Sequence, residues 1–137
     1  MRLACHCGAV AVRIAQSPEY VHECNCSLCR KSGALWGYFN PSDVHVDGPT
    51  RGYTRPDKAS AGASVRFCER CGCTTHFTLT EAAIAAFGNT MAGVNMRLAE
   101  EADLAGVERR SPDGRAWAGD GAFSYVRGPH RMGARQA

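Results

Sequence analysis

Eight cysteines, gathered in three tight groups, limit the fold of this 137-residue chain more than any other feature. The groups are Cys5 and Cys7, then Cys24, Cys26 and Cys29, then Cys68, Cys71 and Cys73. Within each group, neighbouring thiols are separated by only one or two residues. Thiols spaced in this way either bind a metal ion or pair in disulfides, so the fold has to bring their sulfurs together.

The cellular compartment decides between metal and disulfides. Residues 1–5 lack the apolar core of a secretion signal, and no stretch approaches the roughly 20 apolar residues of a membrane-spanning helix. We therefore expect a cytoplasmic protein that has no membrane partner. Disulfides do not persist in a reducing compartment, and this favours metal binding over a secreted disulfide framework.

Local geometry explains why close-set cysteines suit a metal. Residues 68–72 form a Cys-x-x-Cys-Gly turn, which places two sulfurs on one side of a tight loop where backbone N–H groups can donate to them. The Cys-x-Cys pairs at residues 5–7 and 24–26 direct both side chains to one face of an extended chain, because side chains alternate there. Each group therefore supplies two or three ligands.

The number of cysteines fits two zinc ions. A structural zinc has four protein ligands, whereas a catalytic zinc keeps three and one exchangeable position, so eight cysteines allow two closed sites or one closed and one open. We favour a closed site of Cys5, Cys7, Cys68 and Cys71, and an open site of Cys24, Cys26 and Cys29. The spacing also permits other pairings, with Cys73 as an alternative fourth ligand to either ion.

Cys73 and the histidines have simpler interpretations. Cys73 precedes Thr74 on an expected strand and is interpreted as a small buried side chain, because free cysteine is among the most buried residue types. His6 and His22 lie near cysteines in the sequence. None of the five histidines is expected to bind metal, because the cysteines already supply enough ligands.

Alternation and turn residues predict a mainly β domain with short helical turns. Strands or extended runs are expected at residues 10–14, 20–26, 35–39, 44–46, 64–67, 74–80 and 94–98. Helical turns are expected at residues 27–33, 81–87 and 99–105. Residues 51–63 have no clear period and are expected to form a loop or a ragged hairpin. We expect one zinc-binding domain over residues 1–126 and a flexible tail over residues 127–137.

Four sequence blocks resemble one known family. In chain order they are CHCGAV at residues 5–10, CNCSLCRK at 24–31, FCERCG at 67–72 and GVNMRL at 93–98. Together they are similar to the glutathione-dependent formaldehyde-activating enzyme family. The resemblance implies a mainly β, Mss4-like zinc-binding fold, a β-sandwich or set of twisted sheets with short helical turns. Cys73 departs from the family pattern.

The resemblance also selects one of the cysteine pairings that the spacing permits. It implies two Zn²⁺ ions per chain, a structural one at Cys5, Cys7, Cys68 and Cys71 and a catalytic one at Cys24, Cys26 and Cys29. It further implies a carbon–sulfur lyase similar to S-(hydroxymethyl)glutathione synthase. In this hypothesis the catalytic zinc binds glutathione or a similar thiol, whose sulfur adds to formaldehyde or another small aldehyde. Three thiolates overcompensate the charge of zinc, so such an ion suits a thiolate nucleophile better than hydroxide formation.

Basic residues near these blocks are candidates for binding glutathione, which carries two carboxylates. Arg30, Lys31 and Arg97 can orient it through charge-assisted hydrogen bonds, or they can be solvated surface charges. Trp36 and Phe39 either line the pocket or belong to the core.

Two other functions compete with catalysis. A non-catalytic zinc module would bind a protein or nucleic-acid partner, and a basic face with interleaved aromatic residues would favour it. The formal charge is only +3, and basic residues are scattered along the chain outside the arginine-rich tail, so we do not expect nucleic acid. A redox or metal-storage role is suggested by the Cys-Gly-Cys run at residues 71–73.

Overall fold

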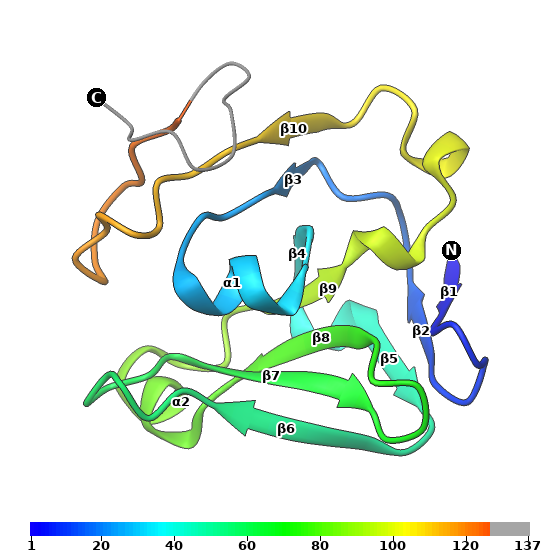
Figure 1. Ribbon diagram of the computed structural model, residues 1–137, viewed down its shortest axis with the longest axis horizontal. Helices are drawn as coiled ribbons and strands as arrows, with labels where there is room; N and C mark the ends of the chain where they lie inside the picture. Colours follow the sequence, from blue (N-terminus) through cyan, green and yellow to red (C-terminus); the bar gives the residue numbers. More distant parts are fainter. Residues whose placement is uncertain (127–137) are drawn as a thin grey trace.

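The computed structural model describes residues 1–126, so the tail expected at residues 127–137 lies outside the described residues. Within residues 1–126 the fold is mainly β, as the sequence predicts, and its strands form two sheets (Figure 1). Helices are short. The longest α-helix of these residues has seven residues, and no helix among them has the length and apolar character needed to cross a membrane.

The smaller sheet joins the N-terminus to the middle of the chain. Its three antiparallel strands run in the order β1 (Arg2–Ala4), β2 (Ala11–Ile14) and β5 (Val44–Asp47). Val12 and Ile14 are buried and Arg13 between them is exposed. This is the period of two that predicts a strand at residues 10–14, and the structure confirms that strand.

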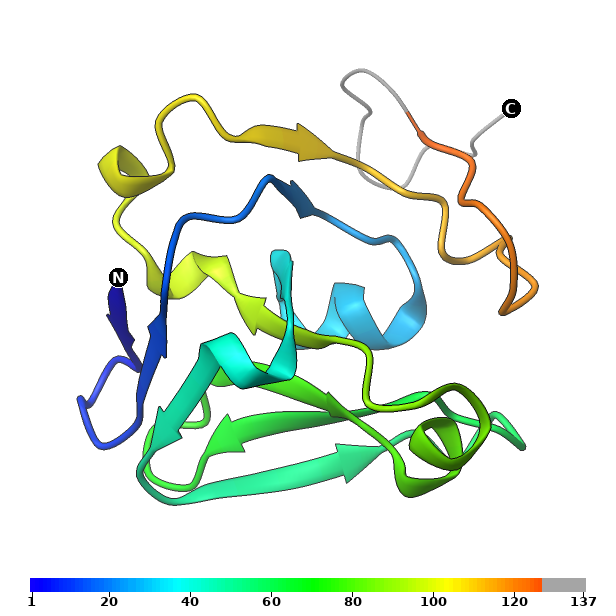
Figure 2. The ribbon, with the colours of Figure 1, turned by 180° about the vertical axis from the view of Figure 1, so that it is seen from behind.

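The larger sheet has seven strands, in the order β10, β3, β4, β9, β8, β7, β6. Their bounds are β3 Tyr20–His22, β4 Trp36–Phe39, β6 Thr50–Thr54, β7 Ala63–Cys68, β8 Thr74–Leu79, β9 Ala92–Asn95 and β10 Glu108–Arg110. Neighbours are antiparallel except for β10, which pairs parallel with β3. Both views show β3 and β10 along one side of the molecule and β6 with β7 along the other (Figures 1 and 2).

Short helices connect these strands. They are α1 (Ser27–Ser32), α2 (Glu81–Phe87) and the 3₁₀ turns η1 (Pro41–Asp43), η2 (Met96–Leu98) and η3 (Glu101–Leu104). The structure confirms the helical turn expected at residues 27–33, because α1 ends at Gly33 in the left-handed conformation with φ 70°. Leu28 and Cys29 of α1 pack against Trp36 and Phe77 of the larger sheet, and this contact fixes where α1 lies.

Side chains from both sheets meet in one core. Its fully or nearly buried members are Leu3, Val12, Ile14, Val21, Leu35, Val94 and Met96. All four residues of β9 are buried, because β9 lies between β4 and β8 in the middle of the larger sheet. Burying an aliphatic side chain of this size contributes roughly 1.5–3 kcal/mol, so this core holds the two sheets against each other.

Residues 51–63 differ from the loop or ragged hairpin expected there. Residues up to Thr54 belong to β6, a regular edge strand that pairs with β7 over its whole length. Four of the five residues of β6 are exposed. Burial therefore imposes no alternation on this sequence, and the strand is defined by backbone hydrogen bonds to β7.

The other differences concern short elements. The strand expected at residues 94–98 ends at Asn95, whose side chain accepts a hydrogen bond from the N–H of Arg97 and starts the turn η2. The helical turn expected at residues 99–105 is the 3₁₀ turn η3. Sequence patterns did not predict β1 and β10, because neither of these three-residue strands shows an alternation of polar and apolar residues.

Gly93 provides the first test of this packing. A Cβ at Gly93 would lie 1.9 Å from Cε1 of Phe77, whose buried ring packs edge-to-face on Trp36 with centroids 4.9 Å apart. Gly93→Ala should therefore lower the free energy of unfolding by about 1–3 kcal/mol through overpacking, measured by urea unfolding of the metal-loaded protein. The control is Gly62→Ala, because a Cβ there meets no atom within 4 Å. Equal losses of stability in the two variants would contradict this packing.

Candidate metal centres and an adjoining pocket

The first candidate centre, the four-cysteine group, consists of Cys5, Cys7, Cys68 and Cys71. Their sulfurs all lie within 4.8 Å of one another, and the Sγ of Cys7 lies 3.6 Å from that of Cys5 and 3.7 Å from that of Cys68. Cys5 follows β1, and Cys68 is the last residue of β7. The group therefore joins the smaller sheet to the larger one.

Two tight turns with similar hydrogen bonds build the four-cysteine group. The N–H of Gly8 donates to the carbonyl of Cys5, the N–H of Gly72 donates to that of Cys68, and both glycines have positive φ, 78° and 74°. Within these turns Val10 N donates to Cys5 Sγ at 3.3 Å, and Arg70 N donates to Cys68 Sγ at 3.4 Å. Backbone donors of this kind stabilise sulfur in its thiolate form.

The second candidate centre, the three-cysteine group, consists of Cys24, Cys26 and Cys29. Their sulfurs lie within 4.8 Å of one another, and all three residues are partly buried. Cys26 is the N-cap of α1 and accepts a hydrogen bond from the N–H of Cys29 at 3.4 Å. The N–H of Cys26 donates to Cys24 Sγ at 3.4 Å, and Nε1 of Trp36 donates to Cys29 Sγ at 3.3 Å. Donors thus converge on every sulfur of the group.

The cysteines of each group differ in how readily their thiols lose a proton. Hydrogen bonds from Cys24 and Cys29 lower the pKa of the Cys26 thiol to about 2, and the bonds to Cys24 and Cys26 raise the pKa of Cys29. In the four-cysteine group, the backbone N–H of Cys73 is the largest cause that lowers the pKa of Cys71, to about 5. In each group, therefore, hydrogen bonds favour the thiolate form of one sulfur. Both donor sets fit a thiophilic metal ion.

The segment after β10 closes one side of the three-cysteine group. Nδ2 of Asn25 donates to Oδ1 of Asp113 at 2.9 Å, and Oδ1 of Asn25 accepts from the N–H of Arg115 at 2.9 Å. Between these contacts the backbone runs close to Cys24 and Cys26, and a Cβ at Gly114 would meet Sγ of Cys24. No spacing rule indicates this contact, because it joins residues about ninety positions apart.

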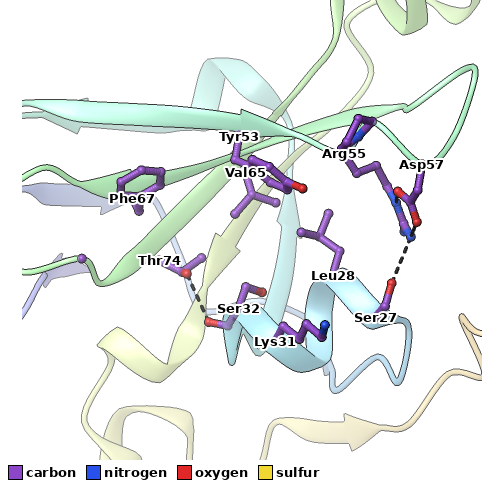
Figure 3. A pocket seen from close by; sticks show the side chains of 12 residues that line it. Ser27, Leu28, Lys31, Ser32, Tyr53, Arg55, Asp57, Val65, Phe67 and Thr74 are labelled. Atoms are coloured by element: carbon purple, nitrogen blue, oxygen red, sulfur yellow. Dashed lines mark hydrogen bonds and ion pairs between the residues drawn. The ribbon is translucent and has the colours of Figure 1, made fainter.

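A pocket of about 550 Å³ lies on another side, next to α1 and strands β6 and β7 (Figure 3). Its charged lining residues are Lys31, Arg55 and Asp57. Arg55 donates from Nε and Nη2 to the two carboxylate oxygens of Asp57, both at 2.7 Å, and from Nη2 to the hydroxyl of Ser27 at 3.0 Å. Ser27 directly follows Cys26, and the pKa of Arg55, which Asp57 raises most, is raised further by Cys26, so the pocket lies near Cys26.

The three basic residues proposed to bind glutathione lie in different places. Lys31 lines the pocket, whereas Arg30 and Arg97 do not. Nε of Arg97 donates to the carbonyl of Gly33 at 2.8 Å, and its Nη2 lies 3.6 Å from Oε1 of Glu23. Sequence reasoning missed Arg55, since residues 51–63 carry neither a period nor a motif.

The remaining candidates lie beside the groups rather than in them. Cys73 packs against the four-cysteine group and is partly buried, and its sulfur belongs to neither group in residues 1–126. No histidine of these residues joins a group, and His130 lies outside the described residues. Trp36 is buried beside Cys29, and Phe39 packs against the main core.

His22 is the buried polar residue nearest in sequence to the three-cysteine group. Its Nδ1 lies 3.0 Å from the hydroxyl of Tyr38, and its Nε2 has no hydrogen-bond partner within the described residues. Burial, reinforced by the nearby charge of Arg110, lowers the pKa of His22. The ring therefore stays neutral at neutral pH and packs edge-on against Phe123 and Tyr125.

Comparison with known proteins identifies a family and a related solved structure. Residues 1–104 match the family described as glutathione-dependent formaldehyde-activating enzyme. The chain is also similar to the crystal structure of a Rhodobacter sphaeroides protein, with 27% sequence identity and a TM-score of 0.60 over 80% of this chain and 99% of that one. No curated protein matches the chain. The family match contains both cysteine groups, whereas Gly114 lies beyond it.

Gly114 tests how closely the later segment packs on the three-cysteine group. Gly114→Ala should push the backbone or Sγ of Cys24 aside, and should weaken metal binding at this group by about 10- to 100-fold. Competition with a chelator, followed by metal analysis, measures the two affinities separately. The four-cysteine group of the same protein is the control and should keep its affinity. Equal weakening at both groups would contradict this geometry.

Proposed function

The chain belongs to the glutathione-dependent formaldehyde-activating enzyme family, and we propose on this premise that it is a zinc enzyme that adds a thiol to a small aldehyde. Glutathione and formaldehyde are the reactants that the family name supports. The reaction class is that of a carbon–sulfur lyase such as S-(hydroxymethyl)glutathione synthase. We place the zinc-binding domain at residues 1–126, and the enzyme in the cytoplasm, because a reducing compartment keeps its eight cysteines free.

One observation carries the proposal: the two groups differ in their number of ligands. The four-cysteine group supplies the full set that a structural zinc needs. In the three-cysteine group no fourth Cys, His, Asp or Glu of residues 1–126 joins the three sulfurs. Three protein ligands and one exchangeable position are the pattern of a catalytic zinc site.

The chemistry at the three-cysteine group follows from its charge. A zinc ion held by Cys24, Cys26 and Cys29 would keep an incoming thiol deprotonated, whereas its three anionic ligands would make it a poor activator of water. The hydrogen bonds from Trp36 Nε1 and from the backbone hold the three cysteine sulfurs in place for this role. The site therefore suits a sulfur nucleophile.

The bond changes are simple and need no oxidant. The substrate sulfur donates an electron pair to the aldehyde carbon and forms the carbon–sulfur bond. The π electrons of the carbonyl move to its oxygen, which takes up the equivalent of the proton that the thiol lost and becomes the hydroxyl of a hydroxymethyl thioether. The chain's contribution is to hold the sulfur and to exclude water on the side closed by residues 111–116, where Asp113 and Arg115 contact Asn25.

Cys26 tests the catalytic role. Serine is a good N-cap, so Cys26→Ser keeps the cap of α1 but removes one metal ligand. We expect the variant to stay folded, to bind one zinc ion instead of two, and to form S-(hydroxymethyl)glutathione at least about 100-fold more slowly. Zinc analysis, circular dichroism and a kinetic assay with glutathione and formaldehyde measure these effects. Full activity in Cys26→Ser would remove the proposal.

Cys68 tests the structural role in the same assays. Cys68 is fully buried and its group joins both sheets, so Cys68→Ser should lose both the ion of that group and most of the folded structure.

A cobalt-substituted protein separates catalysis from a purely structural module. Glutathione should change the visible absorption of cobalt at the three-cysteine group, and an unchanged spectrum would favour the non-catalytic module that binds another macromolecule.

A further inference from the structure

The pocket beside α1 contains more positive than negative charge. Lys31 and Arg55 line it together with a single carboxylate, that of Asp57. Asp57 is bound by Arg55 through two hydrogen bonds, both 2.7 Å long. Within residues 1–126, Lys31 forms no ion pair, so its ammonium is available to an anion that enters the pocket.

Arg55 is held by hydrogen bonds, whereas Lys31 has no ion-pair partner among the described residues. The guanidinium of Arg55 extends from the end of β6 to the hydroxyl of Ser27 at 3.0 Å, and its side chain is only 16% exposed. Asp57, and to a lesser degree the thiolate of Cys26, raise the pKa of Arg55, so its charge persists at every physiological pH. Figure 3 shows this guanidinium between Asp57 and Ser27, with Lys31 farther along the same helix.

The rest of the pocket suits a peptide-like molecule rather than a bare ion. Leu28, Tyr53 and Val65 supply apolar surface, and the hydroxyls of Ser32 and Thr74 lie at the far end of α1. Its volume of about 550 Å³ lies within the range of roughly 300–1,000 Å³ found for small-molecule sites. A tripeptide-sized acid therefore has both the space and the surface that it needs.

The positions of Cys26 and Lys31 on α1 favour a ligand whose thiol and carboxylate are well separated. Cys26 is the N-cap of this helix and Lys31 lies in its last turn, so a ligand that reaches both residues has to extend along the helix. A carboxylate separated from a thiol by about six bonds can span roughly 7 Å, whereas one attached next to the thiol carbon cannot. The carboxylate of the C-terminal glycine in glutathione has the longer separation.

We infer that this pocket is a carboxylate-recognition site, in which Lys31 and Arg55 bind the terminal carboxylate of a peptide thiol whose sulfur lies at the three-cysteine group. The inference rests on the proposed function for the identity of the thiol. It names the substrate class of that site as thiols with a carboxylate about six bonds from sulfur. Lys31 is then a specificity-determining residue, and Arg55 positions both the ligand and the first turn of α1.

The kinetic test compares an acid with its ester. Glutathione and its glycyl ethyl ester have the same thiol, but the ester lacks the terminal carboxylate. Lys31→Met should raise KM for glutathione about ten-fold and leave KM for the ester unchanged, because only the acid loses a charge-assisted hydrogen bond. Arg2→Met is the control, since Arg2 is an exposed cation on β1 that does not line the pocket. Equal effects on acid and ester, or equal effects of the two variants, would overturn the inference.

A binding test separates this inference from the proposed function. S-methylglutathione keeps the carboxylates but has no free thiol, so it reports on the pocket without any reaction. Calorimetry should show that it binds the zinc-loaded wild-type chain and the Arg2→Met variant equally, and the Lys31→Met variant about ten-fold more weakly. Arg55→Gln should also weaken binding, and circular dichroism checks that this variant is folded.

If the wild-type enzyme proves inactive but these differences in binding appear, the proposed function fails and the carboxylate site stands. If activity is present but Lys31→Met binds S-methylglutathione as wild type does, the inference fails alone.

Discussion

The fold depends on sulfur atoms from distant parts of the sequence being held at one point. Cys7 and Cys68 are separated by 61 residues, yet their sulfurs lie 3.7 Å apart. Thiolates at that distance repel each other unless a cation or N–H donors compensate their charge. The four-cysteine group therefore attaches the smaller sheet, which is only three strands wide, to the hairpin of β7 and β8. This attachment adds to the pairing of β1 with β2 and to the burial of Leu3, which also hold this short strand.

A series of hydrogen bonds connects the hairpin of β7 and β8 to the three-cysteine group. Thr74, the first residue of β8, donates from its hydroxyl to the carbonyl of Ser32 at the end of α1. The buried side chain of Asn95 donates to the carbonyl of Thr74 at 2.8 Å and accepts from the N–H of Leu35 at 3.0 Å. These bonds hold the helix that carries Cys29 against the hairpin that carries the four-cysteine group. The structural site thus helps to orient the candidate catalytic one.

Local sequence determined which predictions succeeded. Spacing within residues 24–29 and 68–72 describes single turns, so it predicted the sulfurs that each turn brings together. The pairing of the first cysteines with the third group needed the family resemblance, because spacing says nothing about contacts between distant turns. Arg55 was missed for a related reason: it follows an exposed edge strand, which leaves no burial pattern in the sequence. The contact of Gly114 with Cys24 has no sequence signal either, because it depends on how the chain returns after β10.

Different segments of the chain build the two sides of the three-cysteine group. The pocket side is built from α1, β6 and β7, all within the residues that match the family. The closed side is built by residues 111–116, beyond the family match, where a glycine lets the backbone touch sulfur. The cations that line the pocket, Lys31 and Arg55, lie on the side away from this closed segment. A thiol that enters from the pocket would meet these cations before it reaches the cysteines, so charge recognition and access to the reacting sulfur would share one side of the group.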